Sequence, residues 1–139
     1  MLVKVYMSLK PQLTKRSNII IIDDEEATVD FAAVILKEIG FERVKTFTSV
    51  KKFTDSDLIF NAELIFLDIN LHDMNGLVLL AWIKVKRPSA AVVMFSGDTR
   101  IELVKEAKKL GATSFLSKLE LDKNIRKLFN KWNVDYPLV

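Results

Sequence analysis

The chain has 139 residues, of which half are hydrophobic and 28% are charged, with a formal net charge of +3 and no cysteine. This length fits one domain with a sizeable core, and the composition is that of a globular protein. The lack of cysteine excludes a disulfide framework and a thiolate nucleophile. No apolar run approaches the roughly 20 residues of a membrane span, so we expect no membrane partner. The lack of cysteine fits a cytoplasmic protein, which is the localisation we expect.

The positive charge is concentrated at the N-terminus. Residues 1–17 carry Lys4, Lys10, Lys15 and Arg16 and no acid, which leaves 17 basic and 18 acidic residues, a net charge of −1, for the rest. A nearly neutral body argues against direct nucleic-acid binding. We predict a poorly ordered basic leader over 1–17, with an added strand or docking arm as the alternative. The domain then spans 18–134, and in the short tail 135–139 Pro137 looks more like an end than a linker.

The first half of the chain predicts three strands separated by two helices. The strands are β-branched or densely apolar runs, and the first helix is indicated by apolar residues at helical spacing. That spacing is carried by Phe31, Val34, Ile35 and Ile39. In chain order the elements are strand Ile19–Ile22, a helix ending at Gly40, strand Val44–Phe47, a short helix from its cap Ser49 through Phe53, and strand Leu64–Leu67.

The second half continues the alternation with helix, strand, helix, strand and helix. The first of these helices is apolar almost all round and is therefore predicted to be well buried. The second turns Ile101, Val104 and Ala107 inward. The last is amphipathic and built on Ile125, Leu128, Phe129 and Trp132. In chain order the elements are helix Leu77–Val85, strand Ala91–Phe95, a helix from Ile101 that stops at Gly111, strand Thr113–Ser117, and helix Asp122–Trp132.

This alternation of strands and helices predicts the fold. It favours right-handed βαβ units and a parallel sheet that is covered on both faces. We therefore expect an α/β protein with a flavodoxin-like, doubly wound sheet of five strands in the order 2-1-3-4-5 and five helices, in three αβα layers.

Polar side chains stand at the carboxyl ends of four predicted strands, where such sheets bind ligands. These are Asp23 and Asp24 after the first strand, Asp68 after the third, Ser96 after the fourth and Lys118 after the fifth. Three neighbouring carboxylates repel one another unless a cation lies among them, and oxygen ligands suit Mg²⁺ better than zinc. A carboxylate can also attack phosphorus to give an acyl phosphate, with a lysine and a hydroxyl contacting the phosphoryl oxygens.

These residues give the chain a resemblance to the receiver domains of response regulators in two-component signalling, such as the chemotaxis regulators. The resemblance covers about Asn18 to Trp132. It rests on the acidic pair, on Asp68 followed by Met74 and Gly76, on a serine after the fourth strand, and on Gly-Ala-x-x-Phe-Leu-x-Lys ending at residue 118. Each piece is weak alone, but the four in order are specific.

The resemblance implies a bacterial, stand-alone signalling phosphoprotein that takes a phosphoryl group from a histidine kinase or phosphotransfer protein. It implies self-catalysed phosphorylation rather than conventional enzyme activity, and a downstream protein target reached as a monomer or a phosphorylation-dependent homodimer. The surface made by the last two helices and the last strand would change shape. The implied roles are Asp68 as phosphoacceptor, Asp23, Asp24, Asp68 and the backbone carbonyl of Asn70 as Mg²⁺ ligands, Ser96 and Lys118 as phosphate-sensing residues, and Phe115 as an aromatic switch.

The chain departs from the family pattern at two positions. Leu119 follows Lys118 where the family usually has proline, and His72 replaces the usual proline after Asp68. Both departures bear on switching, and Leu119 favours the alternative of a phosphorylation-independent pseudo-receiver that acts as an interaction module. We expect the side chains of Asn70 and Asp98 to tune the lifetime of the aspartyl phosphate.

Several of these residues also have plain structural interpretations. Asp24, Ser96 or Asp98 can cap helices, and Phe115 can fill the core. A basic group on the last two helices is either a solvated face or a docking face for an acidic partner. It consists of Lys105, Lys108, Lys109, Lys123, Arg126 and Lys127.

Overall fold

The computed structural model describes residues 10–134 and 138. Residues 1–9 of the predicted leader, and Pro137 with most of the predicted tail, lie outside the described residues. The described elements are β1 (Asn18–Ile22), α2 (Glu26–Ile39), β2 (Arg43–Phe47), α3 (Val50–Asp55), the short 3₁₀ helix η1 (Leu58–Asn61), β3 (Leu64–Asp68), α4 (Gly76–Lys86), β4 (Ala91–Ser96), α5 (Ile101–Lys109), β5 (Ser114–Ser117) and α6 (Leu121–Lys131).

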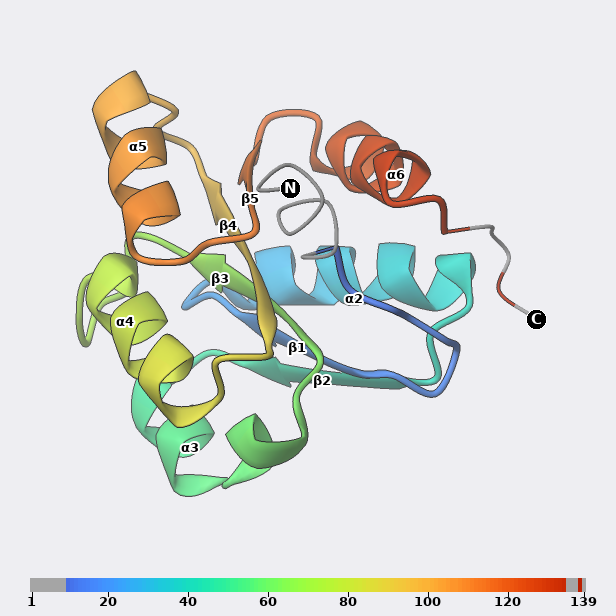
Figure 1. Ribbon diagram of the computed structural model, residues 1–139, viewed down its shortest axis with the longest axis horizontal. Coiled ribbons are helices and arrows are strands. Elements are labelled where there is room, and N and C mark those ends of the chain that lie inside the picture. Colours follow the sequence, from blue (N-terminus) through green and yellow to red (C-terminus); the bar gives the residue numbers. More distant parts are fainter. Residues whose placement is uncertain (1–9, 135–137, 139) are drawn as a thin grey trace, which may run out of the picture.

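The five strands form one parallel sheet in the order β2-β1-β3-β4-β5, which confirms the predicted fold. Figure 1 shows α2 and α6 on one face of the sheet, and α3, α4 and α5 on the other. The predicted order of helices is also confirmed. The sequence did not predict η1, because a single 3₁₀ turn is too short to show a period. None of the helices in the described ranges is long and apolar enough to cross a membrane.

The central strands are buried on both faces, which is why they are continuous apolar runs. In β1, Ile19 and Ile21 belong to the core beneath α2 and α6, whereas Ile20 and Ile22 belong to the core beneath α3, α4 and α5. Each of these side chains is at most 2% exposed, and full burial of such a side chain contributes about 1.5–3 kcal/mol. This two-sided burial holds the ends of β1 and β3 in place below the candidate site.

Three helices expose large apolar side chains. Phe31 and Val34 of α2 are about half exposed, as is Ile101 of α5, and Val85 of α4 is 78% exposed. The prediction that Ile101 turns inward is wrong, and α4 is less buried at Val85 than predicted. A helix that covers one face of a sheet buries a single stripe, and α2 uses a different stripe: Val29, Ala32, Ala33, Ile35, Leu36 and Ile39.

Part of the segment before β1 contacts the domain. The amide of Glu42 donates to the carbonyl of Lys15 at 2.9 Å, and Leu13 packs against the core beneath α2 and α6. The amide of Leu138 donates to the carbonyl of Ile39 at 2.8 Å, so the chain approaches α2 again after α6. The domain boundaries at residues 18 and 134 remain a prediction.

Candidate functional site

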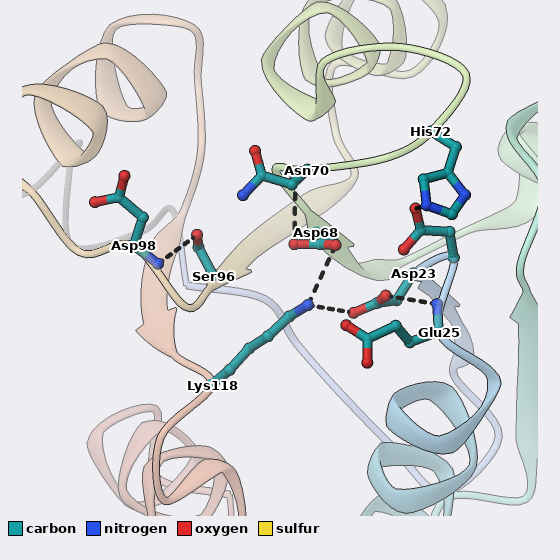
Figure 2. A network of polar contacts seen from close by, with 9 residues as sticks. Asp23, Glu25, Asp68, Asn70, His72, Ser96, Asp98 and Lys118 are labelled. Carbon is teal, nitrogen blue, oxygen red and sulfur yellow. Dashed lines mark hydrogen bonds and ion pairs between the residues drawn. The ribbon is translucent and has the colours of Figure 1, made fainter.

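Side chains from the ends of three strands meet above the carboxyl edge of the sheet (Figure 2). Asp23 follows β1, Asp68 ends β3, and Lys118 follows β5. The ammonium Nζ of Lys118 lies 2.7 Å from Oδ2 of Asp23 and 3.2 Å from Oδ2 of Asp68. To reach them, the lysine crosses β4, where its Nζ lies 5.4 Å from the centre of the Phe95 ring. The long lysine side chain thus links β5 to β1 and β3, neither of which is hydrogen-bonded to β5.

Asp24 completes a group of three carboxylates. Asp23, Asp24 and Asp68 each offer one oxygen, and these oxygens lie within 4.8 Å of one another. Asp23 is fully buried and Asp68 is 2% exposed, because both continue strands that are buried on both faces. Apart from its ion pair with Lys118, the buried Oδ2 of Asp23 has no hydrogen-bond partner among the described residues. A close set of oxygen donors with an under-satisfied buried oxygen fits a hard divalent cation such as Mg²⁺.

Burial controls the protonation of this group. It raises the pKa of Asp68 to about 6, with a further upward contribution from the charge of Asp23, while Lys118 and the amide of Asn70 oppose the shift. Burial also raises the pKa of Asp23, against the hydrogen bond from Lys118. Burial acts to lower the pKa of Lys118, but the hydrogen bond to Asp23 and the charges of Asp68 and Asp23 raise it overall. Lys118 therefore stays charged and partly neutralises the two acids.

We expect Asp68→Asn to stabilise the metal-free protein at neutral pH and not in acid. The folded-state pKa of about 6 lies above the ordinary 3.8, so the folded protein binds the proton more tightly than the unfolded chain does. Ionisation of Asp68 in the fold therefore lowers stability as pH rises from about 4 to 6, by up to about 3 kcal/mol. The asparagine variant should show this gain in free energy of unfolding at pH 7.5 and none at pH 4.

Urea unfolding with a chelator present, followed by tryptophan fluorescence across this pH range, measures that difference. Asp30→Asn is the matched control, because Asp30 is exposed on α2 and its replacement removes no buried carboxylate. If Asp68→Asn raises the free energy of unfolding equally at pH 4 and pH 7.5, the loss of stability in the natural chain does not come from ionisation of the buried Asp68.

The loop after β3 is closed tightly over the end of the strand. Asn70 and Asn75 form an antiparallel bridge, and the amide of Gly76 donates to the carbonyl of Ile69 at 2.6 Å. The side chain of Asn75 accepts from the amide of Leu77 and so caps α4. A Cβ on Gly76 would lie 2.0 Å from the carbonyl oxygen of Asp68. This close backbone contact is the reason that the position requires glycine.

An open cleft of about 630 Å³ adjoins the acidic group. It begins at Asp24 and is bounded by the loop after β3, while Asp23 and Asp68 are not among the residues that line it. The lining residues are Asp24, Glu25, Ile69, Asn70, Leu71, His72 and Asn75. Solvent can therefore approach Asp24 from the side of His72.

The remaining predicted site residues lie around this centre. Ser96 is fully buried and its hydroxyl accepts from the amide of Asp98 at 3.0 Å, while the Asp98 carboxylate is held by the side chain of Arg100 at 2.9–3.0 Å. Phe115 is partly buried against the core beneath α3, α4 and α5.

The helix-capping alternative fails for Asp24, because Asp23 rather than Asp24 accepts from the amide of Glu25, at 2.9 Å.

The turn that presents Lys118 depends on a residue that the sequence analysis did not identify. The side-chain amide of Asn124 donates to the carbonyl oxygens of Ser117 and Leu119, at 3.1 and 2.9 Å. The amide of Lys118 donates to the carbonyl of Ser96 at 2.9 Å, and Leu119 is 78% exposed. Asn124 thus fixes the turn that runs from Ser117 to Leu119 and carries Lys118. No local sequence signal marks it, because its partners are backbone groups.

Buried aspartates and a lysine at the carboxyl edge of a doubly wound sheet place the chain in one class of α/β domain, and its similarity to known proteins identifies the family. Residues 19–130 match the model of the response regulator receiver domain. The chain belongs to this family.

Known proteins show how far the similarity extends. The transcriptional regulatory protein LytR of Staphylococcus aureus is 36% identical over 114 residues, which are 81% of this chain and 45% of LytR; the chain thus spans about half the length of this relative. The CheX–CheY–BeF3–Mg²⁺ complex from Borrelia burgdorferi has a TM-score of 0.74 at 26% identity, over 84% of this chain and 89% of that one. A Burkholderia pseudomallei response regulator with a phosphorylated aspartic acid and a calcium ion has a TM-score of 0.70 at 26% identity, over 79% and 64%.

Proposed function

We propose that this receiver domain accepts a phosphoryl group on Asp68 from a histidine kinase or phosphotransfer protein, in a Mg²⁺-dependent reaction. The contact of Lys118 with both Asp23 and Asp68 is the observation that best supports the proposal. It brings a nucleophilic carboxylate, a metal-binding carboxylate and a fixed positive charge into one place. The phosphorylated aspartate of the Burkholderia structure is consistent with this assignment.

The reaction needs no general base. A carboxyl group with a pKa of about 6 is mostly ionised at pH 7.5, so an oxygen of Asp68 can attack phosphorus directly. The O–P bond to Asp68 forms while the bond from phosphorus to the donor breaks, and the donor departs with the electron pair. Lys118 then moves from the carboxylates to a phosphoryl oxygen. The Ser96 hydroxyl, which accepts from the amide of Asp98 in the structure, donates to another phosphoryl oxygen.

Mg²⁺ would be held by Asp23, Asp24, Asp68 and the backbone carbonyl of Asn70, and when bound it neutralises charge on the phosphoryl group. Lys118 lies against two of these carboxylates, Asp23 and Asp68. The two positive charges of Mg²⁺ and the one of Lys118 would together balance the three negative charges of the carboxylates, and neither cation alone would do so.

The proposed output is a protein contact made by the surface of α5, β5 and α6, reached in the cytoplasm by a monomer or a phosphorylation-dependent homodimer. Movement of Ser96 toward the phosphoryl group would open space for Phe115 to turn inward, which gives a two-state element biased by a local charge. Asp98 and Asn70 would tune the lifetime of the phosphoryl group. For Asp98 this requires release from Arg100, whose side chain donates to its carboxylate.

Phosphorylation by acetyl phosphate tests the proposal without knowledge of the kinase. With Mg²⁺ present, intact mass should show one phosphoryl adduct on the natural chain, no adduct on Asp68→Asn, and loss of the adduct when a chelator is included. Absence of an adduct on the natural chain, together with no binding of Mg²⁺ or beryllofluoride, would reject the proposal and favour the phosphorylation-independent interaction module.

A further inference from the structure

His72 brings a nitrogen donor to the edge of the acidic group. Its Nε2 atom lies 3.2 Å from Oδ2 of Asp24, and Figure 2 shows the ring beside the carboxylates rather than turned away from them. The imidazole is 88% exposed, whereas the side chain of Asp24 is 11% exposed. The contact therefore joins an accessible ring to a carboxylate at the mouth of the candidate metal site.

The separation of these two atoms suits two ligands of one metal ion. Ligands about 2.1 Å from an octahedral cation lie about 3.0 Å apart when they occupy neighbouring positions, which is close to the observed 3.2 Å. The same separation suits a simple hydrogen bond. The two roles make different demands on the side chain, because only an imidazole supplies a strong nitrogen ligand.

The backbone holds His72 near this position. The loop that carries it is closed by the bridge between Asn70 and Asn75 and by the hydrogen bond from the Gly76 amide to Ile69. Both ends of the loop are thus fixed to the end of β3, which also carries Asp68. His72 and Asn70 line the same cleft as Asp24, so a cation bound by Asp24 from this cleft would meet the ring.

We propose that His72 supplies an imidazole ligand to the cation held by the acidic group, and that the site therefore binds first-row transition cations more tightly, relative to Mg²⁺, than an oxygen-only site does. Imidazole suits Ni²⁺ and Zn²⁺, whereas carboxylate, carbonyl and water suit Mg²⁺. The inference rests on the metal site of the proposed function and adds a cation preference that the shared family features do not supply.

Paired titrations of the full, untagged chain with Mg²⁺ and with Ni²⁺ test the cation preference. Loss of the nitrogen ligand in His72→Ala should reduce the preference for Ni²⁺ over Mg²⁺ by about tenfold or more. His72→Gln retains a hydrogen-bond donor for Asp24 but no imidazole, so it should lose the preference equally. Asp24→Asn should weaken the binding of both cations, which shows that they bind at the same site.

Proton NMR of the Ni²⁺-loaded chain gives a second readout. His72 is the single histidine of the sequence, so hyperfine-shifted signals of non-exchangeable imidazole ring C–H protons can come only from this residue, and they should be absent in His72→Gln.

An unchanged Ni²⁺ preference in His72→Ala, a preference retained by His72→Gln, or the lack of hyperfine-shifted ring C–H signals in the natural chain overturns the inference. Tight Mg²⁺ binding alongside any of these results leaves the proposed function intact. Failure of the natural chain to bind either cation rejects the metal site of the proposed function and the inference together.

Discussion

Gly76→Ala is expected to destabilise the protein by about 3 kcal/mol or more and to disrupt the candidate site. The added Cβ would lie 2.0 Å from the carbonyl oxygen of Asp68 and 2.7 Å from Cα of Ile69. Both are backbone atoms of β3 and the loop after it, so no side-chain rotation relieves the overlap. Overpacking in a tight region costs about 1–3 kcal/mol and occasionally more, and here the backbone that carries Asp68 must itself move.

Gly97→Ala is the matched control for this prediction. A Cβ on Gly97 meets no atom within 4 Å, although the residue directly follows Ser96, so its effect on the free energy of unfolding should stay within about 0.5 kcal/mol. Urea unfolding of both variants, with Mg²⁺ titrations of whatever remains folded, gives the comparison. Equal stabilities for the two alanine variants would contradict the steric account of Gly76.

Lys118→Met is expected to destabilise the metal-free protein by about 3 kcal/mol and to make its stability strongly dependent on Mg²⁺. The variant leaves Asp23 and Asp68 buried without the positive charge that lies 2.7 and 3.2 Å from them. Loss of one partner from a buried ion pair typically costs about 3–5 kcal/mol. A cation can replace the missing charge, so Mg²⁺ should bind the variant more tightly than the natural chain and restore about 2.7 kcal/mol at a hundredfold excess over Kd.

Lys84→Met provides the comparison, since Lys84 is also a partly buried lysine. Its ammonium donates to the carbonyls of Pro88 and Ala90, at 2.9 and 2.8 Å, rather than to acids. Its replacement should cost about 1 kcal/mol, equally with and without Mg²⁺. Thermal or urea unfolding of both variants in chelator and in Mg²⁺ separates the two effects. If the free energy of unfolding of Lys118→Met is the same in chelator and in Mg²⁺, the result argues against a cation site at these carboxylates.

The sequence was sufficient for the sheet because each strand is a local signal. Runs such as Ile19–Ile22 are apolar on both faces, which only a covered parallel strand can bury. Their alternation with helices leaves few allowed topologies, and the predicted strand order is the observed one. The same rules brought Asp23, Asp68 and Lys118 to one edge, because the carboxyl ends of parallel strands lie on the same side.

Which helix stripe is buried was decided by tertiary structure. Phe31 and Val34 fit a helical period, but the stripe of α2 that meets the sheet runs through Val29, Leu36 and Ile39. Periodicity identifies a helix and does not fix its rotation about its axis when apolar residues occupy more than one side. The rotation is chosen by close packing against β1 and α6, which is a property of several segments at once.

The site follows the same division between local and long-range information. The sequence by itself determined which residue types stand at the strand ends, and hence the chemistry available there. Tertiary structure decided that burial raises the pKa of Asp68, that Asn124 fixes the turn beside Lys118, and that His72 reaches Asp24. The pKa of Asp68 depends on exclusion of water, and the contact of His72 with Asp24 joins residues far apart in the chain. The Asn124 contacts span only five and seven residues, but they end on backbone carbonyls, which no local pattern of side chains encodes.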